Sequence, residues 1–172
     1  MSFLRAFLCA ALALIFSAAA VSAHVVLTQR SAPADSYFRA SFTVPHGCDG
    51  EATTKISIWL PESVLQAKPQ VKAGWKIETV RVKLDKIVDG PHGTKITERV
   101  AKVIFSGGVV PDDHFDEFTL QLRLPSEAGT LYFPVEQECG GKRRAWSEIP
   151  SPGQKLSDLE NPAASLNVTP KQ

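Results

Sequence analysis

The chain has 172 residues, and its 19 Lys and Arg residues nearly balance its 18 Asp and Glu residues, which gives a formal net charge of +1 at pH 7. This length is enough for one domain with a substantial core. The near-neutral charge, with no basic patch and no run of like charges, argues against nucleic acid and anionic membranes as partners.

The first 23 residues predict a cleaved secretory signal peptide. Arg5 supplies a positive charge, residues 6–16 are apolar, and the segment ends in the small-residue site Val21-Ser22-Ala23. The apolar run is shorter than the roughly 20 residues that a membrane-spanning helix needs. We therefore expect cleavage after Ala23 and a periplasmic or secreted mature chain. Because the C-terminal segment is polar, we expect no membrane anchor in that mature chain.

Period-2 alternation of apolar and polar side chains dominates the remaining sequence. It predicts strands at residues 37–44, 54–60, 75–84, 94–105, 117–124 and 131–138, separated by Pro- and Gly-containing turns. Only residues 61–66 could form a short helical turn, and residues 165–168 could form an edge strand in a Pro-rich tail. We expect a single all-β domain over residues 24–172, folded as a β-sandwich.

Two cysteines, Cys48 and Cys139, remain after Cys9 is removed with the signal peptide. An even pair in an exported protein predicts one disulfide, which would stabilise the fold by roughly 4 to 5 kcal/mol in the loop-entropy model. A metal-binding thiol pair is the alternative, and an oxidising compartment disfavours it.

Motifs of common enzyme classes are missing from the sequence. It contains no G-x-S-x-G, no H-E-x-x-H and no phosphate-binding loop. An ordinary hydrolase or a nucleotide-dependent enzyme is therefore unsupported.

A histidine at the mature N-terminus has more ligand capacity than an internal one. If His24 is the first residue, its α-amine and its imidazole Nδ1 can close a six-membered chelate ring on one metal ion. The α-amine has an ordinary pKa of about 7.7 to 8, so its proton is displaced at far lower cost than that of a lysine. Nitrogen ligands in a tetragonal arrangement suit Cu(II). A Cu(I) site of the Met or Cys type would lack ligands, because Met1 leaves with the signal peptide and both remaining cysteines are expected to be oxidised.

The other histidines add little to this prediction. His46 and His92 each lie in a Pro-His-Gly turn, where exposed polar residues are common. His114 lies in an acidic segment that could supply carboxylate ligands, although such a segment is more often only solvated.

Six blocks stand in order along the sequence: His24-Val25-Val26-Leu27, Val44-Pro45-His46-Gly47-Cys48, residues 69–75, Pro111-Asp112-Asp113 with Asp116-Glu117-Phe118, residues 132–139, and Trp146. Together they resemble the YcnI-like family of exported bacterial copper-binding proteins. The resemblance covers residue 24 to about residue 162. Unlike some members of that family, this sequence predicts no C-terminal anchor.

The resemblance implies a cupredoxin-like or immunoglobulin-like β-sandwich and a Cu(II) site built on the terminal histidine, called a monohistidine brace. Transferred residue by residue, His24 would be the bidentate ligand and Trp146 the tryptophan close to the metal. Glu117 would be a carboxylate ligand or a group that supports one. The protein would act in copper homeostasis as a chaperone or buffer, with the copper ion and other copper-handling proteins as partners.

Two other functions remain open from the sequence. A copper-dependent oxygenase with an N-terminal histidine would need a second histidine facing the first, which His46 or His114 would have to supply. A sandwich that presents its loops to a protein partner would need no metal at all.

Overall fold

The structure, a computed structural model, describes residues 24–171; the predicted signal peptide lies outside the described residues. The strands are β1 (Val26–Leu27), β2 (Ser31–Pro33), β3 (Tyr37–Val44), β4 (Thr53–Trp59), β5 (Gln66–Pro69), β6 (Lys76–Asp89), β7 (Lys95–Val110), β8 (Asp116–Arg123), β9 (Gly129–Phe133), β10 (Val135–Cys139), β11 (Lys142–Trp146) and β12 (Ala164–Thr169). Residues 24–171 contain no α-helix, and two short 3-10 turns lie at Pro91–Gly93 and Leu156–Asp158.

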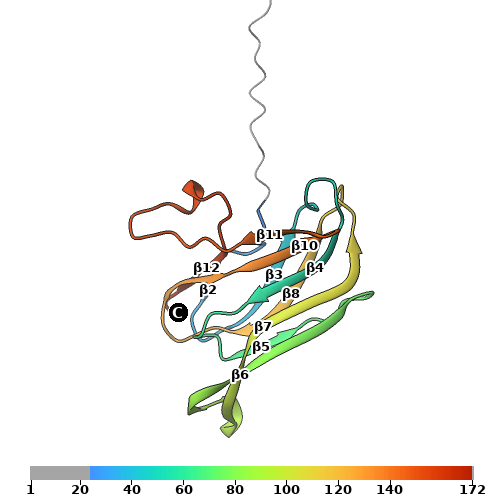
Figure 1. Ribbon diagram of the computed structural model, residues 1–172. Helices are drawn as coiled ribbons and strands as arrows, with labels where there is room; N and C mark the ends of the chain where they lie inside the picture. Colours follow the sequence, from blue (N-terminus) through green and yellow to red (C-terminus); the bar gives the residue numbers. More distant parts are fainter. Residues whose placement is uncertain (1–23, 172) are drawn as a thin grey trace, which may run out of the picture.

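The strands form two facing layers with a small third sheet beside them (Figure 1). One layer has the order β1-β3-β8-β5, the other has the order β11-β10-β4-β7-β6, and the third sheet has the order β2-β12-β9. The predicted all-β sandwich is therefore confirmed.

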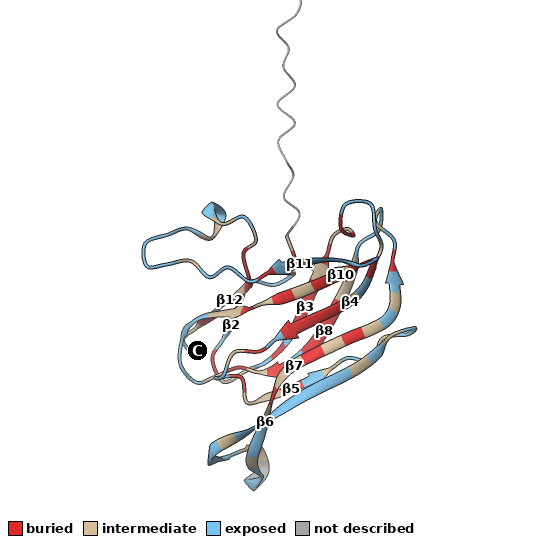
Figure 2. Cartoon of the chain, viewed as in Figure 1, coloured by how far each residue is buried: buried red, intermediate tan, exposed pale blue. Residues whose placement is uncertain are grey.

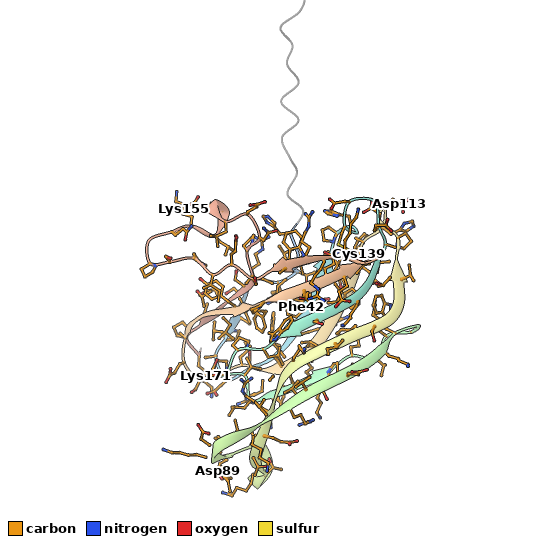
Figure 3. The ribbon with its side chains drawn as sticks, in the orientation of Figure 1. Phe42, Asp89, Asp113, Cys139, Lys155 and Lys171 are labelled. Atoms are coloured by element: carbon orange, nitrogen blue, oxygen red, sulfur yellow. A yellow bond between two sulfur atoms is a disulfide. The ribbon has the colours of Figure 1, made fainter. Side chains whose placement is uncertain are left out.

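Aromatic side chains from both layers fill the space between the sheets. Phe42 and Phe118 come from one layer and Phe105 from the other, and all three are fully buried. The rings of Phe105 and Phe118 meet edge to face with their centroids 5.2 Å apart, the geometry that aromatic pairs prefer. Figure 3 shows Phe42 at the centre of this core.

Alternation along β3 explains why its bounds agree with the sequence prediction. Phe38, Ala40 and Phe42 point into the core, whereas Tyr37 and Arg39 are exposed. The expected helical turn at residues 61–66 is wrong, since this segment contains only a turn closed by Val64 N–H on the carbonyl of Pro61 and then enters β5.

A proline divides the strand expected at residues 131–138. Pro134 has no N–H to donate, so the ladder cannot continue through it. The chain changes sheets there, because β9 pairs with β12 and β10 pairs with β4. The tail strand at residues 165–168 is present as part of β12, but it lies between β2 and β9 and is not an edge strand.

The hairpin of β6 and β7 extends past the sandwich as an arm. Figure 2 shows that most of β6 is exposed, and Figure 3 places Asp89 at the far end of the arm. The predicted strands at residues 75–84 and 94–105 are both present, and both are longer than the alternation suggested. No helix of the described residues is long and apolar enough to cross a membrane.

Candidate metal centre

His24 lies at one end of the sandwich, two residues before the start of β1 (Figure 1). β1 pairs with β3 in antiparallel register, with Val26 opposite Thr43 and Leu27 opposite Phe42. Val25 is buried and packs with the core, whereas His24 is half-buried. The core contacts of Val25 and Leu27 therefore fix the segment that presents the histidine.

The imidazole of His24 contacts the indole of Trp146. The ring centroids lie 5.5 Å apart with an angle of 67° between the planes, an edge-to-face arrangement. Trp146 ends β11, the edge strand of the five-stranded sheet, and is only 2% exposed. The structure therefore brings together His24 and Trp146, the two residues that the family resemblance assigns to one site.

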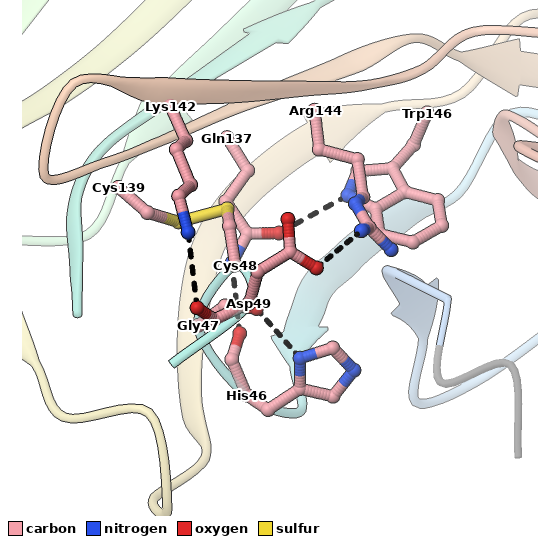
Figure 4. A network of polar contacts seen from close by, with 9 residues as sticks. All are labelled: His46, Gly47, Cys48, Asp49, Gln137, Cys139, Lys142, Arg144 and Trp146. Carbon is pink, nitrogen blue, oxygen red and sulfur yellow. Dashed lines mark hydrogen bonds and ion pairs between the residues drawn. A yellow bond between two sulfur atoms is a disulfide. The ribbon is translucent and has the colours of Figure 1, made fainter. Parts of the chain in front are cut away.

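An arginine covers another part of the same indole. The guanidinium of Arg144 lies 5.5 Å from the Trp146 ring centroid, within cation–π range. Its charge is balanced by Asp49, whose Oδ1 lies 3.3 Å from Nη2 of Arg144 (Figure 4). The cation beside the candidate site is therefore neutralised by an ion pair.

Gln137 connects the tryptophan to the loop that follows β3. Its Oε1 accepts a hydrogen bond from Trp146 Nε1 at 3.2 Å, and its Nε2 donates to the backbone carbonyl of His46 at 2.8 Å and to Thr53 Oγ1 at 2.7 Å. Gln137 is 1% exposed, so these bonds replace water entirely. This role could not be predicted from the sequence, which shows only that Gln137 lies between Val135 and Cys139 and shares their face of the strand.

The loop after β3 is held in a single shape by close contacts. A Cβ on Gly47 would lie 2.0 Å from the carbonyl oxygen of Glu51, so only glycine fits there. Cys48 and Glu51 exchange two backbone hydrogen bonds, and Cys48 is joined to Cys139 by a disulfide. The predicted disulfide is confirmed.

His46 directs one ring nitrogen at this loop. Its Nδ1 lies 2.6 Å from the carbonyl oxygen of Gly47. A carbonyl can only accept, so Nδ1 carries the proton in this bond. His46 is half-buried, which corrects the expectation of an ordinary exposed turn residue.

A small pocket opens on the other side of His24. It has a volume of about 260 Å³ and lies between β1 and the tail segment 156–165. Apolar side chains such as Leu156 and Ala163 line most of it, together with Arg30. The tail, which runs out from the sheets in Figure 1, therefore forms one wall beside the candidate ligand.

Glu117 is not brought together with His24 by any described contact. It lies on β8 opposite Thr43, so β3 separates it from β1. Its Oε2 accepts a hydrogen bond from Ser41 at 2.7 Å, and Ser41 lies farther from the His24 end of β3 than Thr43 does. The carboxylate is thus turned toward the middle of the sheet.

The remaining histidines lie elsewhere. His114 is exposed and pairs with Asp113, whose pKa it lowers through a hydrogen bond of 2.7 Å and through its charge. His92 lies in the 3-10 turn at the arm, Pro91–Gly93. Among residues 24–171, no group of three or more His, Cys, Asp or Glu side chains is arranged to hold a metal ion. A site here would need a residue that supplies more than one donor, and a terminal histidine is such a residue.

Comparisons with known proteins agree with this fold. The chain is similar to a crystal structure of an uncharacterized protein from Nocardia farcinica, described as having an immunoglobulin-like fold. The identity is 26% and the TM-score 0.62, and the match covers 84% of this chain and 97% of the other. A search of curated proteins gives no significant match. The model of a domain of unknown function, DUF1775, matches residues 24–168. The chain therefore belongs to the DUF1775 family.

Proposed function

We propose that this protein is an exported Cu(II)-binding protein, a copper chaperone or buffer rather than an enzyme, and that it binds the ion through a mature N-terminal His24. The observation that carries the proposal is the contact between the His24 imidazole and the buried Trp146 ring. This contact holds the His24 ring against a buried side chain of the other layer.

The ligand chemistry depends on cleavage after Ala23. Cleavage creates an α-amine on the same residue as the imidazole, so one residue offers two nitrogens at fixed spacing. Nitrogen donors favour Cu(II), which also has the highest affinity among the divalent ions of the first row. Because binding requires deprotonated donors, the low pKa of an α-amine makes such a site competent near neutral pH.

The surroundings of His24 support binding of a cation. Val25 and Leu27 hold the backbone in the core, Trp146 restrains the ring, and Asp49 neutralises Arg144 beside it. In this proposal, the cargo is the copper ion, and the protein exchanges it with other copper-handling proteins.

Two variants of the mature protein test the proposal. Adding one glycine before His24 turns the α-amine into an amide nitrogen, which gives up its proton only reluctantly, and His24→Ala removes the imidazole. We expect each to lower the affinity for Cu(II) by at least about a hundredfold, or roughly 2.7 kcal/mol. Isothermal titration measures the affinity, and circular dichroism checks that the fold is retained.

The intact mass of the exported protein, with and without one equivalent of Cu(II), tests the cleavage site and the stoichiometry together. Because Gly-His could recruit its own amine and amide, the electron paramagnetic resonance spectrum of the extended form is compared as well. Unchanged affinity and an unchanged spectrum in that form would show that the amine is not a ligand. Failure of the unextended protein to bind copper would favour a metal-free interaction module.

A further inference from the structure

We infer that the groove between the arm and the four-stranded layer binds a small organic molecule with at least two anionic groups, either carboxylates or phosphates. None of the described residues that line this groove borders the pocket beside His24, and the inference does not depend on copper. Three observations support it, namely the size of the groove, the cations on both of its walls and an exposed aromatic ring beside them.

The groove forms where the arm leaves the sandwich. β5 is the edge strand of the four-stranded layer, and it lies beside β7 of the arm (Figure 1). Val100 is buried at the base of the arm, and the residues before it on β7, from Lys95 to Glu98, line the groove. The groove has a volume of about 670 Å³, which is within the range of sites for small molecules.

Each wall of the groove contributes an arginine and a lysine. The arm supplies Arg81 from β6 and Lys95 from β7, and the four-stranded layer supplies Lys68 from β5 and Arg123 from β8. Among the described residues that line the groove, these four are cationic and Glu98 is acidic. Because the four cations lie far apart in the sequence, the basic character of the groove arises only in the folded chain.

On the arm, both cations have acidic partners that an incoming anion can replace. Nη1 of Arg81 lies 3.1 Å from Oε1 of Glu98, and Lys95 pairs with Asp89. All four side chains are about half exposed or more, and exposed ion pairs contribute little to stability. An anion can therefore bind the arm cations at little cost in lost ion pairs.

On the four-stranded layer, two cations share one carboxylate. The carboxylate of Asp35 lies 3.6 Å from Nη2 of Arg123 and 3.3 Å from Nζ of Lys171. Its single negative charge balances only one of these two positive charges. This wall of the groove therefore keeps a net positive charge, to which Lys68 adds.

A tyrosine ring offers an apolar surface beside these cations. Tyr37 on β3 lies opposite Arg123, and 60% of the tyrosine is exposed. The guanidinium of Arg123 lies 5.3 Å from the centroid of that ring, within cation–π range, so the ring orients the guanidinium. The exposed part of the ring can contact the carbon skeleton of a ligand. An organic anion therefore fits the groove better than an inorganic ion, which has no such skeleton.

The two arginines determine the chemical class of the ligand. A guanidinium presents its donors in a planar fork that binds a carboxylate or a phosphate through two parallel hydrogen bonds. Arg81 and Arg123 lie on opposite walls of the groove. A molecule with two anionic groups can bind both arginines at once, whereas a molecule with one anionic group binds only one of them. The arrangement thus favours a dianion or a more highly charged molecule.

The test uses the full mature chain, residues 24–172, without metal. Citrate and fructose 1,6-bisphosphate are the carboxylate and phosphate probes, and acetate at equal ionic strength is the control with one anionic group. Isothermal titration gives the affinities, and amide chemical shifts in nuclear magnetic resonance locate the site. We expect at least one of the two polyanions to bind with a Kd below about 1 mM, with the largest shifts at the groove. Acetate should bind at least about tenfold more weakly, and the tighter polyanion identifies the anionic group that the site prefers.

Two variants each remove one cation from one wall of the groove, namely Arg81→Gln and Arg123→Gln. We expect each to weaken binding of the tighter polyanion by at least about tenfold. Arg143→Gln is the matched control, because Arg143 is an exposed arginine on β11, outside the groove, and its loss changes the net charge equally. Circular dichroism checks that each variant is folded. If Arg123→Gln does not fold, Arg81→Gln provides the test, because Arg81 lies on the exposed strand of the arm.

Several results would overturn the inference. One is that neither polyanion binds up to about 10 mM, and another is that acetate binds as tightly as the polyanions. An equal loss of affinity in Arg143→Gln and Arg81→Gln would show that the net charge of the protein, and not the groove, attracts the anion. None of these results bears on Cu(II) binding, so the proposed function is tested separately.

Discussion

The imidazole of His24 and the indole of Trp146 meet edge to face although they lie far apart along the chain and next to strands of different sheets. His24 precedes β1 in the four-stranded layer, and Trp146 ends β11 in the five-stranded one. The candidate site thus lies where the two layers meet, and the packing of the whole sandwich sets the distance between the two rings.

We predict that Cu(II) quenches the fluorescence of Trp146. A paramagnetic ion bound to His24 would lie close to the indole and shorten its excited state. Titration of the mature protein with Cu(II) should therefore reduce the emission, and Trp146→Phe should remove most of this reduction. Trp59→Phe is the control, because Trp59 is on β4, two strands away. Equal quenching in the wild-type protein and in Trp146→Phe would place the copper elsewhere.

Gln137→Leu should destabilise the fold by at least about 2 kcal/mol, because the change leaves the indole N–H of Trp146 and the carbonyl of His46 without their buried partner. Urea unfolding measures this as a lower midpoint with an unchanged slope. Gln121→Leu on the exposed face of β8 is the matched control and should stay within about 0.5 kcal/mol of the wild-type protein. Similar losses of unfolding free energy in the two variants would mean that the buried hydrogen bonds of Gln137 do not stabilise the fold.

Replacement of both cysteines, Cys48→Ala with Cys139→Ala, should lower the free energy of unfolding by about 4 to 5 kcal/mol in the loop-entropy model. The disulfide joins residues 91 apart in the sequence, so its loss frees a long loop in the unfolded chain. Thiol labelling of the native protein should find no reactive cysteine. The folded double variant should still bind copper at His24. A folded double variant that no longer bound copper would show that the disulfide takes a direct part in the site.

We predict that Glu117→Gln weakens Cu(II) binding modestly, about twofold. β3 lies between Glu117 and β1, so its carboxylate acts on the ion from about 10 Å, where water and salt leave only a weak attraction. His114→Ala should have no effect, because His114 pairs with Asp113 at the surface. Isothermal titration compares the two variants. A loss of a hundredfold in Glu117→Gln would make this carboxylate a ligand after all.

The sequence was most informative about strands with one buried face. Residues 37–44 alternate because Phe38, Ala40 and Phe42 face the core, so the pattern and the structure share one cause. The strands β1, β2 and β5 have two to four residues, too few for any period to be read. β11 was missed because its sequence, Lys142-Arg143-Arg144-Ala145-Trp146, is mostly charged, and only its pairing with β10 makes it a strand.

The candidate site was predictable only in part. The position of His24 after a cleavage signature drew attention to it, and the family resemblance pointed to Trp146. The role of Gln137 depends on which side chains face each other across the end of the sandwich, and no local pattern contains that information. From the sequence, His46 could not be told from an ordinary turn residue, because the hydrogen bond between its ring and the Gly47 carbonyl depends on the shape of the loop.

The last strand of the chain, β12, lies at the centre of the small third sheet and next to β1, the first strand. β12 pairs in parallel with β2 and in antiparallel register with β9, and it also contacts β1. Contacts between residues so far apart in sequence form slowly, since a long loop must close first. β2, a few residues after His24, therefore has no pairing partner until β12 is in place. A chain truncated before β12 would carry the histidine without part of the wall that the tail forms beside it, so the proposed copper site would be complete only in a chain that includes this last strand.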